Sequence, residues 1–330
     1  MGFDVNEISK NSKGGTELLR MELEKRLPEG LIDDFQIICS RVRELDNEKI
    51  KLYWLHDLPE DPETNHLKDG NSRDRFHKMV FCGNWQYTRY RDYLGVPHDS
   101  NSVVIDNGVE PLPASEKSKD EIRLIYFSTP QRGLELLVPV FEELCKKHDN
   151  IVLDVFSSYS IYGWHDADKR FESVFEKCKQ HPKINYHGSQ PNEVVREALQ
   201  KAHIMAYPSI WMECNSRAVI EAMSAGLLCV HPNYGGLVDT SGGLNFMYQW
   251  DSNQQAHAST FYSALDHAIE TVNLESTQNY LKLVKVYADT RFGWNRIVPQ
   301  WEGLLRMLKD KYPTVESRKA RQPMFRYKTS

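Results

Sequence analysis

The sequence predicts an α/β protein with two parallel-sheet domains, and three observations support this prediction. Short apolar runs alternate with segments of helical apolar spacing, as expected for parallel strands joined by helical crossovers. The chain has 330 residues, enough for two domains of ordinary size. Pro111, Pro113 and the charged stretch SEKSKDE indicate a linker. We therefore expect domains over 1–113 and 114–293.

Composition and charge argue against a disordered chain, a general nucleic-acid-binding protein and a membrane-spanning protein. The chain is 40% hydrophobic and 26% charged, which is typical of globular proteins. Its formal net charge of −5 gives no general attraction to nucleic acid. No apolar run approaches the roughly 20 residues that span a bilayer, and the first residues lack the apolar core of a signal peptide. Six scattered cysteines without a CxxC pair indicate a reducing compartment. We expect a cytoplasmic protein with at most peripheral membrane contact through the basic tail after Tyr312.

In the first half, a glycine pair precedes the first helical pattern. Gly14, Gly15 and Thr16 stand before leucines at helical spacing, and such a pair lets a ligand approach the backbone closely. An ordinary loop is the alternative interpretation. Strands are expected within five ranges, the fourth of which continues through a turn into a helix: 3–8, 34–41, 50–57, 76–96 and 102–106.

The second half continues the alternation. We expect strand-loop-helix over 121–144, a strand from 151, a helix over 169–180, strand-loop-helix over 183–202, a strand over 203–209 and a helix over 261–287. No G-x-G-x-x-G follows any of these strands, which argues against a dinucleotide oxidoreductase.

The stretch 208–236, PSIWMECNSRAVIEAMSAGLLCVHPNYGG, carries the strongest chemical signal. Glu213 and Glu221 are separated by seven residues. Apolar spacing predicts a helix over 216–225, capped by Asn215 or Ser216 and ended by Gly226, with LLCV as the next strand. A helix N-terminus attracts phosphate, and carboxylates beside it accept hydrogen bonds from sugar hydroxyls.

The order Pro-Ser, Glu, seven residues, Glu-Ala-Met-x-x-Gly and Gly-Gly resembles the donor-site signature of retaining glycosyltransferases of family 4. The resemblance extends over most of the chain. It implies the GT-B fold, in which two Rossmann-like doubly wound domains face a central cleft. The Trp-rich segment FGWNRIVPQWEGLLRMLKD resembles the closing helices of the family, so 294–330 is expected to form a helix crossing back to the first domain and a basic tail.

The same resemblance implies roles for particular residues. His56, at the end of a predicted strand, would orient the donor sugar, Glu213 would lie near that sugar, and Arg132 would hold the diphosphate. Glu221 would bind the ribose, and the loop at His187 would contact the base through its backbone. The expected donor-binding residues are Gly14, Gly15, Thr16, Ser128, His187, Ser209, Asn215, Ser216, Arg217 and Glu221. One departure stands out, because small polar residues at 128–131 replace the first basic residue of the family's phosphate loop.

The implied activity is that of a retaining hexosyltransferase. It would move a sugar from a UDP- or GDP-sugar to a hydroxyl of a glycan, lipid-linked or small-molecule acceptor, without metal or cofactor. Asp166 and Asp168 resemble the metal-binding DxD of another glycosyltransferase fold, but a predicted loop precedes them where that motif needs a strand. Two alternatives stay open: a non-catalytic nucleotide-sugar-binding module, and another GT-B enzyme such as a nucleotide-sugar epimerase.

Overall fold

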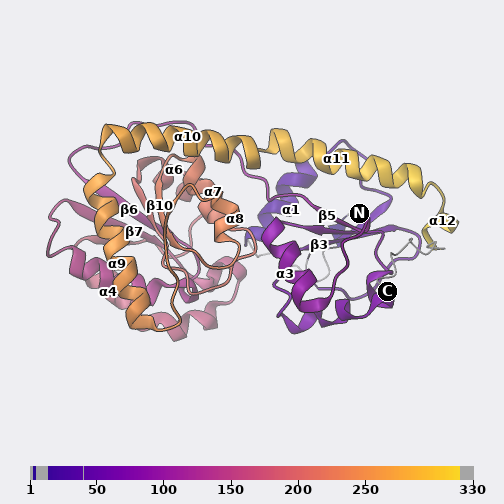
Figure 1. Ribbon diagram of the computed structural model, residues 1–330, viewed down its shortest axis with the longest axis horizontal. Helices are drawn as coiled ribbons and strands as arrows, with labels where there is room; N and C mark the ends of the chain where they lie inside the picture. The colour runs from indigo at the N-terminus through magenta and orange to yellow at the C-terminus, as the bar shows by residue number, and fades with distance from the viewer. Residues whose placement is uncertain (1–2, 5–13, 40, 320–330) are drawn as a thin grey trace. The chain divides into compact units, whose positions relative to one another are not determined.

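A computed structural model describes residues 3–4, 14–39 and 41–319 (Figure 1). By its internal contacts the described chain divides into two compact units. Of the described residues, the first unit contains 3–4, 15–108 and 294–319, and the second contains Gly14 and 109–293. The segment after Gly293 is therefore a constituent of the first unit, although the whole second unit separates it in sequence from the rest.

The first unit is built on a parallel sheet with strand order β1-β2-β3-β4-β5. Every residue of β3 is buried, because helices cover both faces of a central parallel strand. Its strands are β1 (Phe3–Asp4), β2 (Phe35–Ile38), β3 (Ile50–Leu55), β4 (Lys78–Phe81) and β5 (Ser102–Val104). Its helices are α1 (Gly15–Arg26), η1 (Pro62–Lys68), α2 (Gly70–Arg73), α3 (Asn84–Leu94), α11 (Trp294–Lys311) and α12 (Val315–Lys319).

The second unit has a six-stranded parallel sheet of order β11-β10-β9-β6-β7-β8. Its order reverses between β6 and β9, and ligands of such sheets bind at the carboxyl edge near this switch point. The strands are β6 (Ile122–Phe127), β7 (Ile151–Phe156), β8 (Ile184–Tyr186), β9 (Ile204–Ala206), β10 (Leu228–Pro232) and β11 (Phe246–Tyr248).

Two helical layers cover this second sheet. Helix α4 packs against α5 and α9, whereas α7 packs against α10, so the sheet lies between the two groups (Figure 1). The helices are η2 (Pro130–Arg132), α4 (Leu134–Leu144), η3 (Tyr159–Tyr162), η4 (His165–Phe171), α5 (Glu172–Gln180), α6 (Asn192–Lys201), α7 (Arg217–Ser224), α8 (Leu237–Ser241), α9 (Gln254–Thr271) and α10 (Glu275–Phe292).

The structure confirms the α/β class and most of the expected elements, with three differences. The helix expected over 169–180 starts at Glu172, because the residues before it form the 3₁₀ turn η4. The helix expected over 261–287 is two helices, α9 and α10, with a break at 272–274. Of the strand expected over 3–8, Phe3–Asp4 forms β1, and 5–8 lies outside the described residues.

Helix α11 supplies part of the core of the first unit. Trp301 is fully buried, and its ring lies 4.7 Å from that of Trp54 on β3. Trp294 at the start of the helix packs over Gly108, where a Cβ would come within 2.3 Å of the indole. Gly108 is therefore needed so that the chain can pass beneath this ring.

No helix of the described residues is both long and apolar enough to cross a membrane. All six cysteines fall within the described ranges, none is joined in a disulfide, and five are buried.

Removing the Trp301 ring tests whether α11 is part of this core. We expect Trp301→Ala to lower the free energy of unfolding by about 3–5 kcal/mol, since it deletes a fully buried indole. Met307→Ala, at a position 48% exposed on the same helix, should change it by about 0.5 kcal/mol or less. Urea unfolding of both variants measures the difference, and equal losses would contradict the packing described.

Candidate functional site

Three loops meet at the carboxyl edge of the second sheet because glycines let their backbones touch. Gly133, after β6, has φ 119°, and a Cβ there would lie 2.2 Å from the carbonyl oxygen of Pro208, after β9. Gly236, after β10, would bring a Cβ within 2.1 Å of the Cys214 carbonyl oxygen, and its N–H donates to the Glu213 carbonyl at 2.7 Å. The loops after β6, β9 and β10 are thus fixed against one another around the switch point.

A buried ion pair lies where these loops meet. Glu213 is 6% exposed, and its Oε1 atom accepts a 2.6 Å hydrogen bond from the Tyr207 hydroxyl. The same oxygen lies 3.3 Å from Nη1 of Arg132. Burial, together with the Glu213 carboxylate, raises the pKa of Tyr207 above its usual value, so the phenol stays a donor. Burial is the largest single effect on the pKa of Arg132 and lowers it, but the Glu213 carboxylate and the nearby tyrosine side chains together raise the pKa above its usual value, so the guanidinium stays charged.

Several buried polar atoms around this pair have no hydrogen-bond partner among the described residues. They follow the carboxyl ends of β6 and β7 or begin α7: Thr129 Oγ1, Gln131 Oε1, Arg132 Nε, Ser157 Oγ and Arg217 Nε. An unpaired buried polar atom costs about 1–3 kcal/mol, so such a cluster indicates a site that a polar ligand completes. Sequence reasoning missed Tyr207, Thr129 and Ser157. In each case the sequence places a polar side chain within two residues of the end of an apolar strand, and this pattern could have identified them.

Helix α7 begins beside Glu213 and confirms the helix predicted from the apolar spacing. Ser216 occupies the N-cap position, as one of the two predicted alternatives, but its side chain makes no capping hydrogen bond. The first-turn N–H groups therefore lack the usual hydroxyl acceptor, and the positive end of the helix dipole is open to an anion. Within the helix, Arg217 Nη2 contacts Glu221 Oε1 at 2.8 Å, and both side chains are largely buried.

The structure gathers most of the predicted donor-site residues in the second unit. Ser128 accepts a long, 3.5 Å hydrogen bond from Arg132 Nη1, and Ser209 is fully buried, with its hydroxyl bonded to the backbone of Trp211. The residues brought together by the loops after β6 and β9 and by the start of α7 are Ser128, Arg132, Ser209, Glu213, Asn215, Ser216, Arg217 and Glu221.

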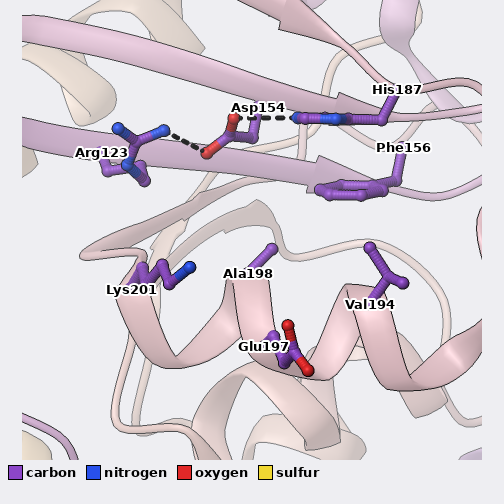
Figure 2. A pocket seen from close by; sticks show the side chains of 8 residues that line it. All are labelled: Arg123, Asp154, Phe156, His187, Val194, Glu197, Ala198 and Lys201. Carbon is purple, nitrogen blue, oxygen red and sulfur yellow. Dashed lines mark hydrogen bonds and ion pairs between the residues drawn. The ribbon is translucent and has the colours of Figure 1, made fainter.

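His187 directs its side chain elsewhere, into a groove between the sheet and α6 (Figure 2). Its Nε2 lies 3.1 Å from Asp154 Oδ1, and its ring stacks on Phe156 at 4.3 Å. Arg123 donates to the same carboxylate at 2.8 Å. The groove encloses about 220 Å³, and none of the predicted residues gathered with Glu213 lines it. Because Asp154 already pairs with both neighbours, we place the candidate site at the unpaired atoms around Glu213.

His56 and the glycine pair belong to other parts of the described chain. His56 directly follows β3, its ring lies 4.6 Å from that of Trp54, and its covered Nε2 has no partner among the described residues. Burial lowers the pKa of His56 to about 3, so the ring is neutral at physiological pH. Gly14 precedes α1 and Gly15 and Thr16 begin it, and a Cβ on Gly15 would meet nothing within 4 Å.

Two acidic clusters have residue types that can bind a metal ion. Asp168 of the DxD sequence accepts a 2.7 Å hydrogen bond from the Tyr159 N–H, and Asp166 pairs with Lys169 on the surface. Among the described residues, one trio has side-chain atoms close enough to share a metal ion: His148, Asp266 and Glu270. Lys147 Nζ already lies 2.7 Å from both of its carboxylates. These carboxylates therefore have structural partners within the chain.

Comparison with known proteins connects this site to sugar transfer. Residues 113–244 match the family model of Glycosyl transferases group 1, which covers less than half of the chain but contains Arg132, Glu213 and Glu221. The gpi3 subunit of phosphatidylinositol N-acetylglucosaminyltransferase from Schizosaccharomyces pombe is 25% identical over 176 residues, 52% of this chain and 37% of the relative. An Arabidopsis thaliana protein that is also named as a subunit of phosphatidylinositol N-acetylglucosaminyltransferase is 30% identical over 144 residues, 41% and 30% of the two chains. The matches span about a third of each relative's length.

Solved structures share the whole architecture at low identity. A glycosyltransferase from Rickettsia africae superposes with a TM-score of 0.65 at 17% identity, over 92% of this chain and 83% of that one. HepE of Anabaena, solved with UDP and glucose, gives 0.62 at 15% identity, over 88% and 82%. These similarities confirm the predicted GT-B fold.

The energetic coupling of the buried ion pair can be measured directly. We expect Arg132→Met to lower the free energy of unfolding by about 3 kcal/mol, because it leaves the Glu213 carboxylate buried without a cation. In a Glu213→Gln background the same change should cost about 1 kcal/mol or less. Urea unfolding of the four proteins in this cycle gives the coupling, and equal costs in both backgrounds would contradict it.

The neutral state of His56 predicts a pH dependence of stability. The unfolded chain protonates this ring below about pH 6.5, whereas the folded chain resists protonation down to about pH 3. The contribution of the neutral His56 ring to stability is therefore complete above about pH 6.5. It is lost progressively as the pH falls from about 6.5 toward 3. Between about pH 8 and 5 we expect the wild type to lose roughly 1–2 kcal/mol more than His56→Asn. Urea unfolding at both pH values tests this, and parallel losses would refute it.

Proposed function

We propose that this protein transfers a sugar from a nucleotide diphosphate sugar to a hydroxyl acceptor. The observation that carries the proposal is the Arg132–Glu213 pair, set among unpaired buried polar atoms beside the start of α7. This arrangement lies within the segment that matches the glycosyltransferase family model. It combines a fixed cation, a helix dipole and a carboxylate, which are the groups needed to hold a diphosphate and a sugar together.

The donor diphosphate is proposed to bind at the first turn of α7 and at Arg132. The Nε atoms of Arg132 and Arg217 are buried without partners among the described residues, so each has a donor available for a phosphate oxygen. Glu221 is proposed to accept hydrogen bonds from the ribose, with Arg217 holding its carboxylate in place. The HepE structure contains UDP, so a UDP-sugar is the favoured donor and a GDP-sugar the alternative.

Glu213 is proposed to hold the donor sugar through its second carboxylate oxygen. Tyr207 and Arg132 both engage Oε1, so Oε2 is available to accept a hydrogen bond from a sugar hydroxyl. The leaving diphosphate would be stabilised by Arg132 and the helix dipole, so we propose transfer with retention and without metal or cofactor.

The acceptor is proposed to be lipid-linked. Two relatives carry phosphatidylinositol in their names, and those names also describe subunits, so we propose that protein partners accompany this chain as well. A second candidate function is a nucleotide-sugar-binding subunit without activity. The absence of a basic residue at 128–131 favours this second function. Only uncharged residues, Ser-Thr-Pro-Gln, precede Arg132 there.

A panel of nucleotide sugars with EDTA present tests the proposal. We expect one donor to bind in calorimetry and to release its nucleotide diphosphate slowly. Glu221→Ala should weaken binding about tenfold or more, because it removes a charged acceptor for the ribose hydroxyls. The control variant Glu275→Ala, on the exposed start of α10, should behave as wild type.

The other outcomes separate the two functions. Donor binding without release, with every acceptor offered, would favour the non-catalytic subunit. Absence of binding to any donor would contradict the donor site itself, and release that EDTA abolishes would contradict metal independence.

A further inference from the structure

The stretch 109–121, which leads into β6, is bound to the second unit along its length. Arg196 on α6 donates to the Glu110 carbonyl at 3.0 Å. Further along, the Ser118 carbonyl accepts a 2.8 Å hydrogen bond from the ring of His203, which lies just before β9. We call 109–121 the strap. These contacts fix its course over the second unit, so the side chains that it carries have set positions there.

Two lysines occupy the carboxyl end of α7, where the last carbonyl groups of a helix have no partner within it. Lys285 of α10 donates to the Ser224 carbonyl at 2.5 Å. Lys117 of the strap donates to the carbonyls of Ala225 and Gly226 at 3.4 and 3.2 Å. Both ammonium groups therefore lie against the negative end of the helix dipole, which favours cations.

The charges of these two lysines are compensated to different extents. Lys285 Nζ lies 2.9 Å from the Asp289 carboxylate, so a nearby anion balances its charge. Lys117 forms no ion pair with a carboxylate of the described residues. The charge left uncompensated at this end of α7 is therefore that of Lys117. The titratable and charged groups around Lys117 come from the neighbouring elements and from the groove that it also lines: Cys229, Lys285, Glu116, Glu121, Arg123, Lys201 and His203.

The charge of Lys117 carries a cost in stability. Burial lowers the pKa of Lys117 to about 8, with the Cys229 side chain acting against this shift and the charge of Lys285 adding to it. The unfolded chain keeps the proton up to about pH 10.5, so the folded state loses stability as the pH falls from there toward 8. A charge that the fold keeps at pH 7 against such a cost indicates a role other than folding.

The other end of α7 is where this charge would act. The helix has eight residues and is therefore about 12 Å long. Its first turn is the place where the donor diphosphate is proposed to bind. Two unit charges about 12 Å apart, at an effective dielectric constant of about 20, change an affinity roughly tenfold. Lys117 can therefore strengthen the binding of a diphosphate without touching it.

We propose that Lys117 is a positioning residue for the donor, because its charge holds the carboxyl end of α7 and raises the positive potential at the first turn of that helix. The inference rests on the proposed donor site, and Lys117 takes no part in the bond changes of transfer. Since binding and protonation are linked, a bound diphosphate in turn favours the charged form of Lys117.

The experiment measures the affinities of the full chain for UDP and for uridine by calorimetry at about pH 7 and 9, on either side of the pKa of Lys117. Uridine lacks the diphosphate, so the charge should not affect it. GDP and guanosine replace this pair if GDP is the nucleotide that binds. The test variants are Lys117→Met, which is uncharged, and Lys117→Arg, which stays charged at both pH values. Lys119→Met is the matched control, because Lys119 is an exposed lysine of the same strap.

We expect wild type and Lys119→Met to bind UDP at least about threefold more weakly at pH 9 than at pH 7, and uridine equally at both. Lys117→Arg should bind UDP equally at both pH values. Lys117→Met should bind it at both as weakly as wild type does at pH 9. Raising the pH from 7 to 9 should also raise the urea midpoint of wild type relative to Lys117→Met. A merely structural lysine would not give weaker UDP binding together with higher stability.

Two results would overturn the inference and leave the donor site in place. One is equal UDP affinity in wild type and Lys117→Met at pH 7, with both proteins folded by urea unfolding. The other is a loss of UDP affinity between pH 7 and 9 that Lys117→Arg retains in full. A protein that binds neither UDP nor GDP would contradict the proposed donor site, and the inference with it.

Discussion

The buried contact among Arg132, Glu213 and Tyr207 is the constraint on which the second unit's functional edge depends. A carboxylate and a guanidinium removed from water must be paired closely, or the fold loses several kcal/mol. That pairing requires the loops after β6 and β9 to touch, and they can do so only because Gly133 has no side chain where Pro208 passes. Gly236 permits the same closeness between the loops after β10 and β9. The loops that carry the candidate site are thus held against one another by contacts within the described chain.

The charged groups of the second unit are paired to different extents at two places. In the groove between the sheet and α6, Asp154 is shared among Arg123, His187 and Asn185, and Figure 2 shows the first two of these contacts. Around Glu213, the ion pair involves one carboxylate oxygen of Glu213 and one guanidinium nitrogen of Arg132. The atoms Arg132 Nε, Thr129 Oγ1 and Ser157 Oγ have no hydrogen-bond partner in the described chain. Unpaired groups with fixed positions distinguish a binding site from a structural ion network better than the size of a hollow does.

Local patterns predicted much of this structure, and long-range contacts account for what they missed. The helix at 217–224, its stop at Gly226 and the strand after it follow from apolar spacing and glycine alone. Nothing local indicates that Tyr207 donates to Glu213, since the loop between them sets that geometry. The Ser216 hydroxyl does not cap α7 although the sequence favours it. The break between α9 and α10 is missed because helical apolar spacing on both sides of it predicts one helix.

A crystal structure of the protein with UDP bound would test the central claim most directly, since it shows whether the nucleotide binds beside Arg132 and Glu213 or in the groove between the sheet and α6. The account predicts the diphosphate at the first turn of α7, within hydrogen-bond distance of Arg132 and Arg217, with the ribose against Glu221. A nucleotide bound instead in the groove beneath α6, with its phosphates on Arg123 and Lys201, would contradict it.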